Sequence, residues 1–396
     1  MIIQASHRLD RVQEYWFSSK LQEVNALEQM GKQIINLGIG NPDMPPSPGT
    51  VLALCRQATE QATHGYQPYR GLSLLRTAMA NWYHRIYGVS FNPNSEVLPL
   101  IGSKEGIFHI SMAFLNPGDR VLVPDPGYAS YGGAARMAGA EPVAYDLLEE
   151  NQWLPDLDAL DKVEGVKIMW INYPHMPTGA LAHSADFARI VAWARKKRIL
   201  ICHDNPYSLI LNETKPLSIF QIPGAERCCL ELNSLSKSHN MAGWRLGMVT
   251  GRSDYISTIL TVKSNVDSGM FLPIQHAGVE ALNNPQSWHE DQNDRYRRRR
   301  EQVYRMMDAM GFSYQRDAAG MFVWGKAPDS VKDVAQYLDG ILYETGVFIT
   351  PGHIFGKNGE RYARVSTCAP VAKILRAAEK IETYMNSTPQ LATAHL

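Results

Sequence analysis

The chain has 396 residues, 45% hydrophobic and 20% charged, so it can bury a sizeable core and has the length of two or three domains. Lysine and arginine number 39, as do aspartate and glutamate, which excludes a general attraction to nucleic acid or anionic membranes. The N-terminus lacks a signal-peptide pattern, and no stretch approaches the ~18 apolar residues of a membrane span. Five scattered cysteines indicate neither a metal site nor a disulfide framework. These features predict a soluble cytoplasmic protein that acts on small molecules, without nucleic-acid or membrane partners.

The first fifty residues change character twice. An amphipathic pattern up to Met30 predicts a helix, and QIINLGIG at 33–40 predicts an extended segment. The proline-rich NPDMPPSPGT at 41–50 can continue neither element. We therefore expect it to form a linker that crosses between two bodies of the protein.

From Val51 onward, short apolar runs alternate with helix-length segments, which indicates parallel strands in an α/β sheet. Many of these runs end in Gly, Pro, Asp or Asn. Ligands in open α/β sheets bind beyond the carboxyl ends of the strands, so these endings predict a site. The runs are VLPLIG (97–102), DRVLVPD (119–125), EPVAYDL (141–147), VKIMWINYP (166–174), RILICHDNP (198–206), RCCLELNS (227–234) and RLGMVTG (245–251).

After Leu282 the pattern changes to a long polar helix over 283–310, followed by a smaller α+β segment. Its predicted elements are AGMFVWGKA (319–327), a helix over 331–345, GVFITPG (346–352), RYARVSTC (361–368) and a final helix from Ala372.

These changes of pattern predict a two-domain organisation. Residues 45–283 form the large α/β domain, and residues 284–396 form a small α+β domain. Residues 1–44 are expected to belong to the small domain as its N-terminal segment.

The basic run RYRRRR at 295–300 has two interpretations. It could bind nucleic acid, or it could be a solvated helix face whose arginines pair with Glu290, Asp291, Asp294 and Glu301. One basic run in a neutral chain is weak evidence for nucleic acid, so the solvated face is favoured.

Two predicted strand ends carry polar groups with more than one interpretation. Gly102-Ser103-Lys104 lies between a strand and a helix and can form a backbone anion site, or simply a strand–helix turn. Asp204, after RILICH, could cap a helix, bind a metal or hold a proton on a heterocyclic nitrogen.

The stretch SLSKSHNMAGWRLG places a lysine among groups that bind anions. Ser234, Ser236 and Arg245 can donate to a dianionic group, so Lys237 would be an amine beside a phosphate site. If desolvated, it could attack an aldehyde, although an isolated lysine is more often exposed. Arg364, on a predicted strand of the smaller domain, could clamp a carboxylate or form an exposed salt bridge.

These four groups together point to one ligand chemistry. A phosphate cradle, an acid for a ring nitrogen, an imine-forming lysine and a carboxylate clamp are what pyridoxal 5'-phosphate and an amino acid need. The conjunction is much more specific than any one part.

The motif S-x-S-K-x-x-x-x-x-G-x-R-x-G, Ser234 to Gly247, resembles that of the class I/II aminotransferases of fold type I, and the resemblance extends over essentially the whole chain. It implies a large domain with a mostly parallel seven-stranded sheet, a smaller α+β domain and transfer of an amino group between an L-amino acid and a 2-oxo acid. It implies the Schiff-base lysine at Lys237, the ring-nitrogen acid at Asp204 and the donor to the ring oxygen at Tyr207. The remaining implied contacts are Gly102, Ser103, Lys104, Ser234, Ser236 and Arg245 at the phosphate, Tyr128 stacked on the ring, and Gly40 and Arg364 at the substrate carboxylate.

The resemblance also implies a homodimer with shared active sites. Tyr66, in YQPYRG, matches the tyrosine that reaches the neighbouring subunit's phosphate, and Asn265 is a candidate cross-subunit substrate contact. The motifs LIGSKEG, DPGY, DNPYS and KSNVDSG are most similar to LL-diaminopimelate aminotransferase and its alanine- and aspartate-using relatives. The implied donor is therefore LL-diaminopimelate, aspartate or alanine, with 2-oxoglutarate as acceptor. For a distal carboxylate, Lys104, Arg70 and Arg136 are the candidates.

One position departs from the family pattern. The family usually carries N-x-x-N-P-T-G, in which the second asparagine bonds the ring oxygen, whereas this chain has Met176 there. Methionine cannot donate that bond, so we expect a raised pKa for the cofactor imine, or a side chain that merely fills space.

Three rival functions share part of these motifs. A β-lyase or decarboxylase would use the same cofactor and the same residues. Ser234-x-x-Lys237 also matches the S-x-x-K signature of serine acyl enzymes, but S-D-N and K-T-G are absent from the sequence. A non-catalytic sensor would ordinarily need a DNA-binding module, for which the chain has no spare N-terminal domain. Transamination is the favoured function.

Overall fold

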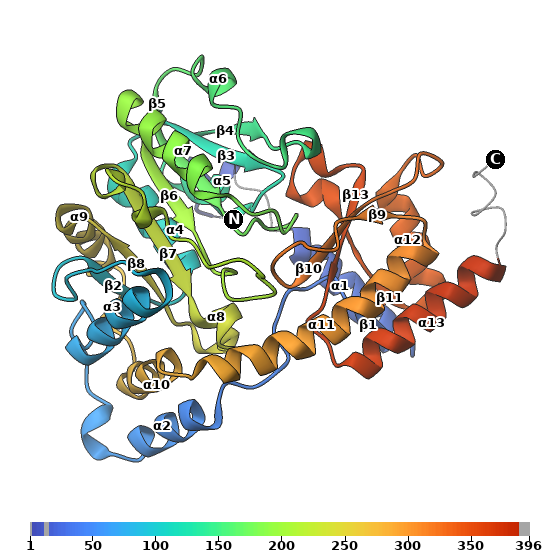
Figure 1. Cartoon of the computed structure of the whole chain (residues 1–396), viewed down its shortest axis with the longest axis horizontal. Helices are drawn as coiled ribbons and strands as arrows, with labels where there is room; N and C mark the ends of the chain where they lie inside the picture. Colours follow the sequence, from blue (N-terminus) through green and yellow to red (C-terminus); the bar gives the residue numbers. More distant parts are fainter. Residues whose placement is uncertain (1, 12–15, 388–396) are drawn as a thin grey trace.

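A computed structural model describes residues 2–11 and 16–387 of the chain. All seven apolar runs form strands of one seven-stranded sheet, in the order β2-β8-β7-β6-β5-β3-β4 (Figure 1). This confirms the predicted α/β architecture. The strands are β2 (Val97–Leu100), β3 (Arg120–Asp125), β4 (Glu141–Asp146), β5 (Val166–Asn172), β6 (Leu200–Asp204), β7 (Cys229–Ser234) and β8 (Gly247–Gly251).

The sheet is parallel except at one strand. Strand β8 runs antiparallel to both of its neighbours, β2 and β7. The prediction of a parallel strand was therefore wrong for RLGMVTG. The physical reason is that β7 and β8 lie side by side, so residues 235–246 reverse the chain between them instead of crossing the sheet.

Helices on both faces explain why the strands are almost continuously apolar. On β5, Ile168 and Trp170 belong to one buried cluster with α4, whereas Met169 and Ile171 belong to another with α7. All four side chains are fully buried, and each such burial contributes roughly 1.5–3 kcal/mol. The helices of this half are α2 (Pro48–Ala58), α3 (Ser73–Tyr87), α4 (Ser103–Phe114), α5 (Ser130–Met137), α6 (Leu157–Leu160), α7 (Ser184–Lys197), α8 (Leu235–Ser238), α9 (Ser253–Lys263) and α10 (Leu272–Leu282).

Two smaller sheets form the other half of the molecule. One is four-stranded, in the order β12-β13-β10-β9, and the other pairs β1 with β11. Helix α1 and β1, near the start of the chain, lie beside the C-terminal elements (Figure 1). The predicted domain boundaries stay a prediction. The elements are α1 (Trp16–Gln29), β1 (Ile35–Asn36), α11 (Gln286–Ala309), β9 (Ser313–Tyr314), β10 (Phe322–Lys326), α12 (Val334–Thr345), β11 (Val347–Phe348), β12 (Thr350–Pro351), β13 (Tyr362–Ser366) and α13 (Val371–Ser387).

The basic run on α11 is only partly the solvated face that we expected. Arg297 forms an exposed ion pair with Asp294, but Arg299 and Arg300 are buried. The Arg299 guanidinium donates to both carboxylate oxygens of Asp43, at 2.6 and 3.0 Å. The solvated-face prediction is wrong for these two arginines, because Arg299 bonds Asp43 of the linker and Arg300 donates to the Ala318 carbonyl at 2.9 Å. In the described part of the chain, no helix is long and apolar enough to cross a membrane.

Candidate active site

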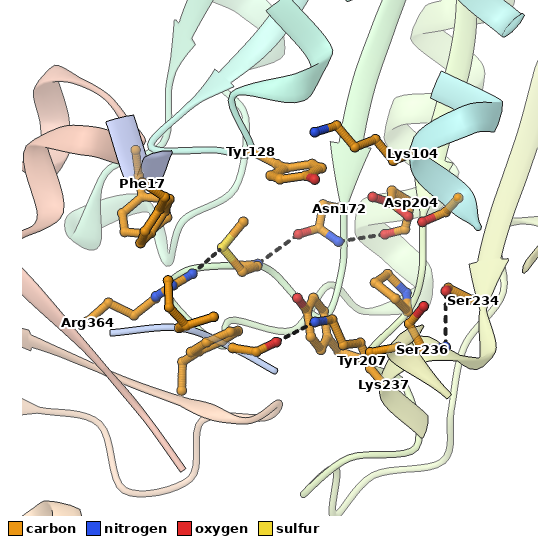
Figure 2. Close-up of a pocket in the computed structure, with 18 of the residues that line it drawn as sticks. Phe17, Lys104, Tyr128, Asn172, Asp204, Tyr207, Ser234, Ser236, Lys237 and Arg364 are labelled. Carbon is orange, nitrogen blue, oxygen red and sulfur yellow. Dashed lines mark hydrogen bonds between the residues drawn. The ribbon is translucent and has the colours of Figure 1, made fainter. Parts of the chain in front are cut away.

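A cavity of about 490 Å³ lies at the carboxyl ends of the strands of the large sheet (Figure 2). It faces β10 and β13 of the four-stranded sheet. Strands β5, β6 and β7 end at Asn172, Asp204 and Ser234, and all three residues line the cavity. The site therefore lies at the predicted edge of the sheet. The predicted site residues that line it are Gly40, Ser103, Lys104, Tyr128, Asp204, Tyr207, Ser234, Ser236, Lys237, Arg245 and Arg364.

One end of the cavity is suited to an anion. Ser103 is the first residue of α4, where backbone N–H groups point outward from the helix N-terminus. Ser234 caps α8, and its Oγ accepts a hydrogen bond from the Ser236 N–H at 3.2 Å. The Arg245 Nη1 lies 3.5 Å from the Ser236 Oγ. Hydroxyls, a helix N-terminus and a guanidinium in one place can bind a phosphate dianion.

Asp204 presents a buried carboxylate oxygen to the same cavity. Its Oδ2 accepts a hydrogen bond from the Tyr131 hydroxyl at 2.8 Å, whereas its buried Oδ1 has no hydrogen-bond partner. Burial raises the pKa of Asp204 to about 6, against the opposing effects of the Tyr131 hydrogen bond and of His203. Among the cavity-lining residues that the structure describes, Asp204 is the only acid, and histidine and cysteine are absent.

Two tyrosines line the walls beside Asp204. Tyr128 lies with its ring edge-on to Tyr131, 5.6 Å between centroids, and Tyr207 lies against Phe322. Burial raises the pKa of both Tyr128 and Tyr207. Their hydroxyls therefore stay protonated at neutral pH and can act as hydrogen-bond donors.

Lys237 is a partly buried amine that lines the cavity (Figure 2). Its Nζ donates to the Gly40 carbonyl oxygen at 2.5 Å. Burial lowers the pKa of Lys237, and the charges of Arg364 and Arg245 lower it further, against an opposing effect of Cys368. The alternative of an exposed surface lysine is wrong. A larger neutral fraction makes this amine a better nucleophile and base.

Arg364 lies on the opposite side of the cavity from Ser234 (Figure 2). The side chain is buried, so the alternative of an exposed salt bridge is wrong. Its guanidinium carbon lies 4.1 Å from the ring centroid of Phe322 and 4.5 Å from that of Phe355, and its Nη2 donates to the Gly38 carbonyl at 2.7 Å. Stacked rings hold a guanidinium in a defined plane, as a carboxylate site requires.

Met176 lines the cavity between these groups. Its Sδ accepts a hydrogen bond from the Arg364 Nη1 at 3.2 Å, and its backbone N–H donates to the Asn172 Oδ1 at 2.8 Å. The expectation that Met176 merely fills space is therefore incomplete, because the sulfur contacts a charged residue.

Five predicted residues lie outside the cavity lining. Gly102 directly precedes the lining residue Ser103 at the start of α4. Tyr66 is 92% exposed and borders a separate hollow of about 280 Å³, and Asn265 is exposed on the surface. Their assignment to a neighbouring subunit's site stays a prediction. Arg70 and Arg136 do not line the cavity either, so Lys104 is the only one of the three distal-carboxylate candidates that does.

Most of the aromatic and aliphatic residues of the site were not predicted from the sequence. Such side chains are usually buried in a core, and these come from distant parts of the chain, so no local pattern identifies them. Tyr131 was closest to detection, because it follows Tyr128 by three residues and donates to Asp204. The missed lining residues are Phe17, Leu21, Ile39, Tyr131, Pro206, Ala242, Phe322 and Phe355, together with the polar Asn172.

The residues present fit pyridoxal phosphate. The unpartnered Asp204 Oδ1 is placed to accept a hydrogen bond from a protonated ring nitrogen, and such a partner would offset its desolvation. The anion end can hold the phosphate, and the Lys237 amine lines the same cavity. A phosphate, a ring nitrogen and an aldehyde thus each meet a suitable side chain.

The turn before α4 provides a direct test of the phosphate end. Gly102 has φ 79° and ψ 157°, a conformation that is essentially restricted to glycine, and an added Cβ would clash with the Arg245 Nη2. Gly102→Ala is expected to weaken pyridoxal phosphate binding about tenfold or more, because it displaces this guanidinium. A fluorescence titration of the cofactor-free protein measures the affinity. Gly133→Ala, whose Cβ would meet nothing within 4 Å, is the matched control and should bind normally.

Comparison with known proteins agrees with this geometry. Residues 32–381 match the family model for aminotransferase class I and II. The LL-diaminopimelate aminotransferase of Aquifex aeolicus is 40% identical over 381 residues, which are 95% of this chain and 98% of that protein.

Solved structures are similar over nearly the whole chain. The substrate-bound BacF structure from Bacillus subtilis superposes with a TM-score of 0.92 at 33% identity, covering 96% of this chain and 98% of that one. A probable N-succinyldiaminopimelate aminotransferase from Thermus thermophilus has a TM-score of 0.85 at 33% identity, with 93% and 99% covered. The chain therefore belongs to the class I and II aminotransferases, and it is a pyridoxal-phosphate-dependent transaminase of the subgroup that includes LL-diaminopimelate aminotransferases.

Proposed function

We propose that the enzyme transfers the amino group of an L-amino acid to 2-oxoglutarate, with LL-diaminopimelate as the first donor to test and aspartate or alanine as alternatives. The observation that carries the proposal is that one cavity holds a partly buried amine, an unpartnered buried carboxylate oxygen and a buried arginine. The identity to LL-diaminopimelate aminotransferases supports the choice of donor.

Each end of the cavity has a binding role in this proposal. Ser103, Ser234, Ser236 and Arg245 hold the phosphate, with the Gly102–Lys104 turn shaping that end. Tyr128 stacks on the pyridine ring, Asp204 accepts a hydrogen bond from the ring nitrogen, and Tyr207 donates to the ring oxygen. Asp204 thereby keeps the ring nitrogen protonated.

Lys237 and Arg364 then act on the substrate. Bound pyridoxal phosphate supplies an aldehyde that condenses with amines and a ring that accepts electrons released at Cα. Arg364 binds the α-carboxylate and orients the Cα–H bond perpendicular to the ring. The Lys237 amine would remove the Cα proton as general base and then, as general acid, deliver it to the cofactor carbon that carried the aldehyde. The lowered pKa of Lys237 favours the neutral amine that this step needs.

We infer a homodimer in which each subunit completes its partner's site. Tyr66 is almost fully exposed in the single chain, and Asn265 also lies on the surface outside the cavity. Tyr66 of the partner subunit would reach the phosphate and Asn265 of the partner subunit the substrate. Sedimentation of the Tyr66→Phe variant should show an intact dimer. A fluorescence titration of the same variant should show weakened binding of pyridoxal phosphate.

The visible absorption spectrum tests the proposed function. Purified protein with pyridoxal phosphate should develop a yellow band that bleaches with the true donor and returns with 2-oxoglutarate. A band that forms but never cycles would favour the β-lyase or decarboxylase alternative. No band at all would contradict cofactor binding through Lys237.

Arg364→Ala is expected to raise KM for the amino acid roughly 100-fold and to lower kcat much less, because a buried charge-assisted contact to the carboxylate is lost. Steady-state kinetics with the identified donor measure both constants. Arg297→Ala, which removes only the exposed ion pair with Asp294, is the control and should be neutral. A loss of roughly 100-fold in kcat with an unchanged KM would contradict the role of Arg364 in binding the carboxylate.

A further inference from the structure

A continuous series of contacts joins the two sides of the active site through Met176 (Figure 2). Arg364 donates to the Met176 sulfur at 3.2 Å, and the Met176 N–H donates to the Asn172 Oδ1 at 2.8 Å. The Asn172 Nδ2 in turn donates to the backbone carbonyl of Asp204 at 2.6 Å. The series therefore links the arginine on β13 to the acid at the end of β6.

The sulfur contributes to the orientation of the guanidinium. The rings of Phe322 and Phe355 contact Arg364 and favour one plane for its guanidinium, but stacking alone leaves rotation within that plane free. Hydrogen bonds from two different nitrogens restrict that rotation: Nη2 donates to the Gly38 carbonyl, and Nη1 donates to the Met176 Sδ. A thioether accepts hydrogen bonds but cannot donate them, so Met176 suits an arginine, which only donates.

The position of the sulfur is itself well determined. Met176 is 7% exposed, and its backbone is held by the Asn172 side chain at the end of β5. Asn172 is 3% exposed and is held by Asp204. A displacement of the β5–β6 edge would therefore be transmitted through Met176 to Arg364.

We propose that Met176 is a positioning residue for substrate binding: its sulfur fixes the orientation of the carboxylate-binding Arg364 and relates it to the Asp204 end of the cofactor site. The inference rests on the proposed function, because it takes Arg364 as the carboxylate contact. Met176 acts on the substrate end of the cavity, so its loss weakens carboxylate binding and leaves the cofactor's absorption unchanged.

The test compares Met176→Leu with Met176→Gln in the cofactor-loaded enzyme. Leucine keeps a similar volume without an acceptor, whereas glutamine restores an acceptor oxygen. Propionate, a carboxylate without an amine, serves as the probe, and its affinity is measured by calorimetry. Met176→Leu is expected to weaken propionate binding about five- to tenfold, and Met176→Gln to recover most of the loss. A pH titration of the visible band reports on the cofactor and should match wild type in the leucine variant.

Met79→Leu is the matched control, because Met79 is fully buried in a separate cluster around α3. It should leave propionate binding and the visible band unchanged. If Met176→Leu fails to fold, the propionate affinities of Met176→Ala and Met176→Gln are compared instead. Weakened propionate binding is then expected only for the alanine variant.

Two outcomes would overturn the inference. One is wild-type propionate affinity in the variant that lacks an acceptor. The other is a shifted pH midpoint of the visible band with unchanged propionate affinity, which would place Met176 at the cofactor instead. If wild-type enzyme itself shows no visible band, the proposed function fails, so the two failures are distinguishable.

Discussion

Lys237→Ala is expected to reduce turnover at least about 1,000-fold, because the variant loses both the amine that bonds to the cofactor and the base that moves the Cα proton. The cavity offers no second amine in a comparable position among its described residues: Lys104 also lines it, but from the turn at the start of α4. Single-turnover kinetics on cofactor-loaded protein measure the loss, and the visible spectrum reports whether the lysine bond to the cofactor still forms.

Lys237→Arg is the informative companion variant. Arginine keeps the positive charge, but its pKa above about 12 leaves no neutral nitrogen to act as nucleophile or base. Both variants should therefore be inactive while pyridoxal phosphate still binds through the phosphate end of the cavity. Near-normal turnover in either variant would remove Lys237 from the mechanism.

Asp204→Asn is expected to have two opposite effects, a turnover loss of roughly 1,000-fold and a more stable cofactor-free protein. Burial raises the pKa of Asp204 from 3.8 to about 6, so the folded state holds this proton more tightly than the unfolded chain does. The contribution of protonated Asp204 to the free energy of unfolding is fully present below about pH 4, and it is lost as pH rises through about 6. At neutral pH the ionised carboxylate is then roughly 2–3 kcal/mol less favourable than it would be in the unfolded chain. Asparagine removes this cost.

Urea denaturation of cofactor-free protein at pH 4.5 and pH 7.5 measures the effect. The stability advantage of Asp204→Asn should be larger at pH 7.5, where wild type carries the buried charge. Added pyridoxal phosphate should stabilise wild type more than the variant, because only a carboxylate pairs with a protonated ring nitrogen. Equal stability of the two proteins at both pH values would show that Asp204 is not buried as a charge, and undiminished turnover would exclude it from the reaction.

The sequence alone determined the framework of this protein. Each strand of the large sheet was predicted from its apolar run, because strands covered by helices on both faces need apolar side chains at consecutive positions. The residues at the ends of these strands, Asp204 and Ser234 among them, were predicted as site residues because the carboxyl ends of parallel strands meet at one edge. Lys237 and Arg245 were predicted together because they stand in one local motif, and both line the cavity.

Only the tertiary structure decided what surrounds these groups. Strand β8 runs antiparallel, although its sequence resembles its parallel neighbours, because direction depends on how the connection crosses the sheet. Arg299 is buried against Asp43, 256 positions away, although its run of arginines has the composition of a solvated face. Tyr66 and Asn265 stay predictions, because their proposed contacts lie in a second chain.

Arg364 shows the physical reason most clearly. Its environment combines Phe322, Phe355, the Gly38 carbonyl and Met176, which lies 188 positions earlier in the sequence. Periodicity and spacing record which residues are neighbours within a helix, a strand or a turn. Burial, pKa shifts and contacts such as the Met176 sulfur bond arise only when separate elements pack, so they depend on the folded arrangement of the whole chain.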